Sequence, residues 1–183
     1  MTVTLKTSRL TLRPFTHGDL NDFAALHADA EVMHDLGGPI TRRDAAAKLT
    51  GYIANAARHG YGRWAVFHGQ VFAGYVGILH HDDPAHPLGP HDEIGWRLHR
   101  AFWGQGVASE AAHAALTDAV DRLGLTHVLA YTAPDNLRSQ AVMARLGLER
   151  APDMDFEEPY APVGIWHGMV WRVPQAGFAG GME

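Results

Sequence analysis

A glycine-rich turn at residues 103–108, WGQGVA, constrains the fold more than any other segment. It lies between a predicted strand, Glu93–Leu98, and a predicted Ala-rich helix, Val107–Leu123. Glycines at such a turn let the backbone approach a ligand, and the free N–H groups of the new helix favour an anion such as a pyrophosphate. The absence of a following lysine excludes a P-loop. The two glycines alone are equally typical of a turn with a purely geometric role.

The elements around this turn are predicted from hydrophobic periodicity and from capping and breaking residues. Thr16 with Asp19, and Thr41 with Asp44, resemble helix capping boxes. In order, we expect a strand at 9–15, helices at 16–28 and 41–58, a hairpin of strands at 63–67 and 71–79, a proline-rich loop at 80–92, a strand at 93–98, a helix at 107–123, a strand at 127–132, a helix at 136–146 and short strands between 149 and 174.

This order predicts an α+β fold built on a mixed, mostly antiparallel sheet with about four helices. We expect a single domain over residues 1–174 and a flexible tail over 175–183. A Rossmann domain requires a βαβ unit at its glycine turn, whereas the strands before residue 103 look antiparallel. A dinucleotide-binding oxidoreductase therefore stays open only as a minor alternative, which stabilisation of the native protein by NAD would support.

Composition excludes several other classes. The chain has 183 residues, 46% of them hydrophobic, a net charge of −5 and no cysteine. This balance suits a globular protein and argues against electrostatic nucleic-acid binding. Without cysteine there is no disulfide, thiolate zinc site or cysteine nucleophile. No apolar segment has the length of a signal peptide or membrane span, so a cytoplasmic protein without a membrane partner is the simplest expectation.

Four motifs in order resemble the GNAT acyltransferases of the RimJ/RimL branch. They are RLTLRP at 9–14, EIGW at 93–96, FWGQGVASEA at 102–111, and Asn136 with Ser139 and Met143 before LGL at 146–148. Each motif is weak alone, but together they cover roughly residues 5 to 173. Trp103 departs from the Arg or Gln of the family consensus and leaves the backbone turn intact.

The resemblance implies acetyl-CoA as the acetyl donor and a central strand pair that splays apart. Pantetheine would then pair with the open edge of Glu93–Leu98, and the pyrophosphate would meet the amides at the glycine turn. The residues expected to contact the cofactor are Trp96, Arg97, Leu98, Gln105, Gly106, Val107, Ala108, Ser109 and Asn136.

Acetyl transfer needs a group that takes the proton of the amine and a donor for the leaving thiolate. By analogy with the family, Glu93 is the candidate base, and Asp92 is the weaker choice because it points to the opposite face of the strand. Many members of the superfamily place a tyrosine acid where this chain has Met143. Ser139 is the candidate acid in its place, and Tyr131 is an outside candidate for either role.

Histidines and carboxylates crowd the segment 80–92. They are His80, His81, Asp82, Asp83, His86, His91 and Asp92. Their spacing matches no zinc motif, so we expect no metal, although a histidine here could line the acceptor side or relay a proton. His167 is interpreted as structural or acceptor-lining, and Trp96 and Trp166 as core or wall.

Together these features predict an N-acetyltransferase that transfers the acetyl group of acetyl-CoA directly to a primary amine in a ternary complex. The acceptor could be a protein N-terminus or a small amine, and the lack of cysteine excludes an acyl-cysteine intermediate. The alternative is a CoA-binding or regulatory domain without useful catalysis, which Met143 favours. Monomer and homodimer are equally open.

Overall fold

The computed structural model describes residues 3–160 and 164–174. The strands and helices follow the predicted order, preceded by a two-residue strand, β1, that was not predicted. Their bounds are β1 Leu5–Lys6, β2 Leu10–Pro14, α1 Leu20–Ala28, α2 Arg42–His59, β3 Arg63–His68, β4 Val71–His81, β5 His91–Leu98, α3 Val107–Asp121, β6 Val128–Thr132, α4 Leu137–Arg145, β7 Glu149–Arg150, β8 Phe156–Tyr160 and β9 Gly164–Arg172.

The strands form one mixed sheet in the order β1-β2-β3-β4-β5-β6-β9-β7, and β8 pairs with β9. Among the described strands, only β5 and β6 run parallel to each other. They pair at just two positions, Asp92 with Val128 and Glu93 with Leu129, and then diverge. This divergence confirms the predicted α+β fold with a central sheet that splays apart.

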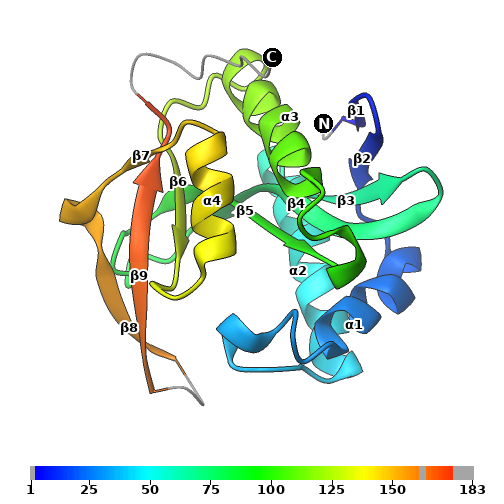
Figure 1. Cartoon of the computed structure of the whole chain (residues 1–183), viewed down its shortest axis with the longest axis horizontal. Helices are drawn as coiled ribbons and strands as arrows, with labels where there is room; N and C mark the ends of the chain where they lie inside the picture. Colours follow the sequence, from blue (N-terminus) through cyan, green and yellow to red (C-terminus); the bar gives the residue numbers. More distant parts are fainter. Residues whose placement is uncertain (1–2, 161–163, 175–183) are drawn as a thin grey trace.

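The helices pack on both faces of the sheet because successive residues of a strand point to opposite sides. Trp64 and Val66 of β3 belong to the core that includes the alanines of α3, whereas Ala65 packs with α1 and α2. Figure 1 shows α3 and α4 side by side where the sheet divides. The apolar stripes on the four helices therefore fix the two halves of the sheet around the split.

The predicted helix boundaries have their expected physical causes. The Thr16 and Asp19 capping box is present, but a short 3-10 turn follows it, so α1 begins only at Leu20. Thr41 Oγ1 accepts the N–H of Asp44 at the start of α2. Gly60 ends α2 at φ 79°, a conformation that glycine adopts without strain.

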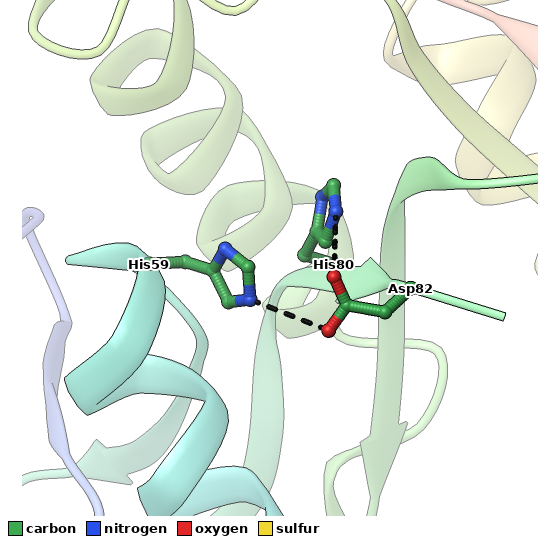
Figure 2. A group of neighbouring side chains, drawn as sticks. All are labelled: His59, His80 and Asp82. Atoms are coloured by element: carbon green, nitrogen blue, oxygen red, sulfur yellow. Dashed lines mark ion pairs between the residues drawn. The ribbon is translucent and has the colours of Figure 1, made fainter.

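The prediction of a loop over residues 80–92 was wrong at both ends. β4 continues to His81 and β5 begins at His91, so that only 82–90 connects them. Cross-strand pairing of His80 with Asp92 and of His81 with His91 extends the ladder. The three prolines and Gly89 that predicted the loop all lie within this shorter connection. At this corner the end of α2 lies beside the end of β4, which brings His59 next to His80 (Figure 2).

The short strands predicted between residues 149 and 174 are β7, β8 and β9, and β9 is the longest of them with nine residues. The tail over 175–183 lies outside the described residues. The single domain over 1–174 stays a prediction. Within the described part of the chain, every helix is too short or too polar to cross a membrane.

Buried His27 of α1 makes stability depend on pH. Its Nδ1–H donates to the Phe23 carbonyl at 2.8 Å, and burial lowers its pKa from 6.5 to about 4. Between these values the unfolded chain binds a proton that the folded chain does not, so stability falls as the pH falls. We expect His27 to contribute roughly 3 kcal/mol to this loss.

Urea unfolding at pH 7 and about pH 4 should show a smaller loss of unfolding free energy for His27→Gln than for wild type. The exposed His34→Gln is the control, and equal losses in all three proteins would contradict the assignment.

Candidate active site

A cavity of about 710 Å³ opens where β5 and β6 diverge. Its floor is the segment Ile94–Leu98 of β5, whose edge toward β6 has no ladder partner among the described residues. Its walls come from the turn at 103–109, the end of β6 with the start of α4, and the loop before α2. The cavity thus joins an open strand edge to two helix starts.

The start of α3 presents free donors to this cavity. Gly104 and Gly106 have φ values of 71° and 77°, where a side chain would be strained, and Gly106 precedes the first turn. The first helical bond runs from Glu110 N–H to the Gly106 carbonyl, which leaves the N–H groups of residues 107–109 outside the helix ladder. Within the described residues these groups have no side-chain cap, and the buried Ser109 Oγ makes no hydrogen bond. Such an arrangement suits an anionic group.

Gln105 is the one predicted cofactor contact that does not line the cavity. Its side chain donates to the Ala101 carbonyl, and its own carbonyl accepts from Arg9 at 3.1 Å. Arg9 also pairs with Glu110 of α3 at 2.7 Å. These bonds tie β2 to the glycine turn, so Gln105 is placed to hold the turn rather than to line the cavity.

The start of α4 forms the opposite wall. Asn136 Oδ1 accepts the N–H of Ser139 at 3.0 Å, and both residues line the cavity. Met143 packs in the core and also reaches the lining. Arg138 stacks on Trp103 at 3.8 Å and, like Arg145, brings positive charge to the opening. The two arginines were missed from the sequence because nothing in the spacing links α4 to the glycine turn.

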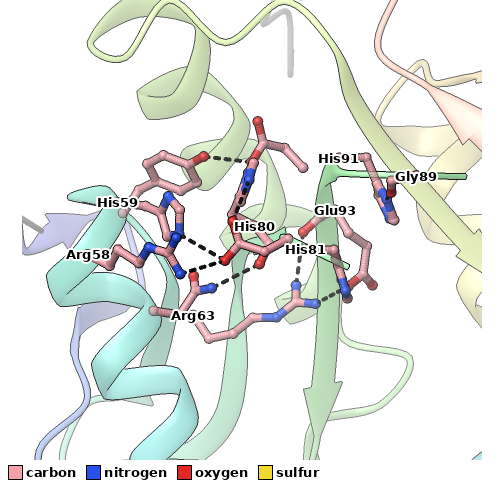
Figure 3. A network of polar contacts seen from close by, with 12 residues as sticks. Arg58, His59, Arg63, His80, His81, Gly89, His91 and Glu93 are labelled. Atoms are coloured by element: carbon pink, nitrogen blue, oxygen red, sulfur yellow. Dashed lines mark hydrogen bonds and ion pairs between the residues drawn. The ribbon is translucent and has the colours of Figure 1, made fainter. Parts of the chain in front are cut away.

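Glu93, the last residue of β5 that pairs with β6, lines the cavity and forms a buried ion pair with Arg63 (Figure 3). Arg63 Nη2 donates to its Oε2 at 2.6 Å, and His81 Nε2 lies 3.0 Å from the same oxygen. Burial alone would raise the pKa of Glu93, but Arg63 and His81 outweigh it and hold that pKa below its usual range. The carboxylate is therefore ionised at neutral pH and accepts hydrogen bonds from two cationic or polar partners.

His81 connects Glu93 to an aromatic cluster that contains Tyr131, an outside candidate from the sequence, and two further histidines of the segment 80–92. The Oη of Tyr131 lies 3.3 Å from His81 Nε2 and 3.4 Å from His91 Nε2. The rings of His81 and His91 are stacked with centroids 4.7 Å apart, and the His86 ring lies 4.7 Å from His91, tilted by 49°. Burial raises the pKa of Tyr131, so the phenol stays protonated, and burial lowers the pKa of His86 and His91.

The remaining predicted positions fall into those that line the cavity and those that do not. Trp96, Arg97, Leu98, Gly106, Val107, Ala108 and Ser109 line the cavity, and so does Trp166 of β9. Asp92 points away from Glu93 and accepts a hydrogen bond from Tyr61 Oη at 2.6 Å. His167 is exposed, pairs with Glu157 at 3.0 Å and does not line the cavity.

Residues 9–149 match the family model described as "Acetyltransferase (GNAT) domain". The FsC-acetyl coenzyme A-N(2)-transacetylase of Aspergillus fumigatus is 33% identical over 174 residues, which cover 91% of this chain and 74% of that protein.

Solved structures resemble the fold. The acetyltransferase of Agrobacterium tumefaciens has a TM-score of 0.77 at 30% identity and covers 94% of this chain and 95% of its own. The RimL ribosomal L7/L12 alpha-N-protein acetyltransferase in complex with coenzyme A has a TM-score of 0.74 at 17% identity, over 93% and 97% of the two chains, and shows the fold alone.

Proposed function

Because this chain is an acyltransferase and belongs to the GNAT acetyltransferase family, we propose that its cavity binds acetyl-CoA and that the enzyme transfers the acetyl group directly to a primary amine. GNAT acetyltransferases use acetyl-CoA as donor. One observation carries the proposal: in the part of the chain that the structure describes, the edge of β5 without a ladder partner and the start of α3 without a side-chain cap meet in one cavity. An extended arm can pair with the edge while its phosphates meet the helix N–H groups.

The residues at the two ends of this cavity fit the two halves of CoA. Backbone N–H groups at Val107, Ala108 and Ser109 suit the pyrophosphate, and Arg138 supplies charge beside it. Trp96, Arg97 and Leu98 of β5 offer the strand edge to the pantetheine arm. The thioester would then lie toward Glu93, where the opening narrows to the last paired residues.

A protonated amine cannot attack a thioester, so the site needs a proton acceptor. We assign this role to Glu93, with His81 as the relay, because the two lie 3.0 Å apart and both line the cavity. An ionised carboxylate beside the imidazole stabilises the ring when it takes up a proton. Ser139 on α4 is the proposed donor to the leaving thiolate, since Met143 has no proton to give. Tyr131 stays an alternative donor.

The acceptor is proposed to be a protein N-terminus or a small amine. The resemblance to the RimJ/RimL branch favours the N-terminus, whereas the name of the Aspergillus relative, an N(2)-transacetylase, describes transfer to an N(2) nitrogen. The cytoplasmic location, the open choice between monomer and homodimer, and the absence of a metal, nucleic-acid or membrane partner are predictions from the sequence.

Release of CoA thiol over a panel of peptides and small amines tests the function. We expect release above acetyl-CoA hydrolysis for at least one class of primary amine, and loss of that release with N-acetylated acceptors. The alternative of a CoA-binding or regulatory domain predicts that acetyl-CoA raises the melting temperature while no amine accelerates thiol release. Stabilisation by NAD without stabilisation by acetyl-CoA would exclude both.

A further inference from the structure

A second cluster of polar side chains lies outside the cavity, on the other face of β5. It joins His59 at the end of α2, His80 at the end of β4 and Asp82 just after β4 (Figure 2). We infer that His59, His80 and Asp82 form a binding site for one divalent transition-metal ion of the Zn²⁺ class. One ligand atom from each residue lies within 4.8 Å of the other two.

The distances between the ligand atoms are close to those of a tetrahedral zinc site. Bonds of about 2.0–2.1 Å at tetrahedral angles place neighbouring ligand atoms about 3.4 Å apart. His80 Nε2 lies 3.4 Å from Asp82 Oδ1, and His59 Nε2 lies 3.7 Å from Asp82 Oδ2. The two imidazole rings are 4.4 Å apart between centroids. Small side-chain movements would close the set around an ion.

Hydrogen bonding determines which atoms face the centre of the cluster. A carboxylate only accepts, so the His80 Nδ1 that lies 2.8 Å from Asp92 Oδ1 carries a proton. The Nε2 of the same ring then points at Asp82. Tyr61 Oη holds Asp92 at 2.6 Å, and Asn55 donates to the His80 carbonyl. A carboxylate that orients a ligating histidine is the usual outer shell of a metal site.

A metal ion would also give the His59 ring nitrogen a bond that it lacks. Among the described residues, the buried Nε2 of His59 makes no hydrogen bond. The negative charges of Asp82 and Asp92 face the two rings, and the Arg58 guanidinium binds Asp82 from its side at 3.0 Å. Asp82 is 47% exposed, so an ion and a water ligand can enter there. The spacing of residues 80–92 could not reveal this site because His59 comes from α2.

Zinc titration of the chelator-treated full-length protein tests the site. We expect one Zn²⁺ per chain and a melting temperature about 5 °C or more higher at saturating metal. His59→Ala and Asp82→Asn should each weaken binding at least about tenfold. Co²⁺ in place of Zn²⁺ should give the visible absorption of a four-coordinate site in wild type but not in His59→Ala or Asp82→Asn.

His68→Ala, at an exposed histidine remote from the cluster, is the matched control and should bind as wild type does. His86→Ala tests whether the metal binds instead at the neighbouring rings of His81, His86 and His91. His59→Gln keeps the size of the side chain and replaces the alanine variant if that one melts early without metal. No saturable binding, or binding unchanged by both His59 and Asp82 substitutions, overturns the site and leaves the cluster as histidine–carboxylate ion pairs only.

Discussion

Replacing Glu93 by glutamine is expected to lower kcat for amine acetylation by about 10²- to 10⁴-fold, the usual contribution of a positioned acid or base. The amide keeps the shape of the side chain, but it cannot take a proton and cannot stabilise a protonated His81, which lies 3.0 Å away. The affinity for acetyl-CoA should stay close to wild type because the strand edge and the helix start are unchanged. Steady-state kinetics and calorimetric titration with CoA measure the two quantities separately.

Two further variants keep this experiment interpretable. Glu93→Gln leaves the buried Arg63 guanidinium without its carboxylate, which destabilises the fold. His81→Gln keeps that ion pair and should still lower kcat if the imidazole is the relay. Glu149→Gln changes an exposed carboxylate that also pairs with an arginine, Arg172, and should have wild-type kcat. Full activity of a folded Glu93→Gln enzyme would rule out Glu93 as the proton acceptor.

Replacing Gly106 by valine is expected to weaken acetyl-CoA binding at least about tenfold, which corresponds to about 1.4 kcal/mol. Gly106 has a φ of 77°, and a β-branched residue there is strongly disfavoured. A Cβ at this position would have room, with Arg9 Nη2 as its nearest neighbour at 3.6 Å. The penalty is therefore conformational, and relief of the strain would turn the N–H groups of α3 away from the cavity.

Gly124 provides a matched control at the other end of the same helix. It has a φ of 67°, and a Cβ there would meet nothing within 4 Å. Valine at either position should lower the free energy of unfolding by about 1–2 kcal/mol. Only the Gly106 variant should lose CoA affinity. Equal affinities of the two variants would show that the turn at 103–109 does not bind the cofactor.

Much of the fold could be predicted because its elements end at residues with a physical reason to end them. Thr41 and Gly60 bound α2, and Gly106 and Gly124 flank α3. The error at residues 80–92 arose because three prolines and Gly89 marked the whole segment as a loop, whereas all four lie within 82–90. His91 is buried within β5, and only the register with β4 reveals that it belongs to a strand.

The candidate site could be predicted only in part, for reasons of distance along the chain. The motif EIGW located Glu93, and the structure explains its glycine: a Cβ on Gly95 would lie 2.7 Å from the Arg63 guanidinium. Arg63 itself, 30 residues away from Glu93, gave no signal in the sequence. The sequence likewise gives no signal that His81 lies beside Tyr131 or that Arg138 lies over Trp103. Each pair meets only when β4, β6 and α4 are packed in the fold.

The split between β5 and β6 also bears on solubility. A continuous sheet exposes unpaired backbone groups only at its two outer strands, and such edges are templates for association with other chains. Here the divergence after Glu93 creates an edge in the middle of the molecule. The turn at 103–109 and α4 flank that edge, so they narrow the approach of a foreign strand. A molecule extended along β5 would shield it completely, and occupancy of the cavity would then protect the protein from aggregation as well as prepare it for catalysis.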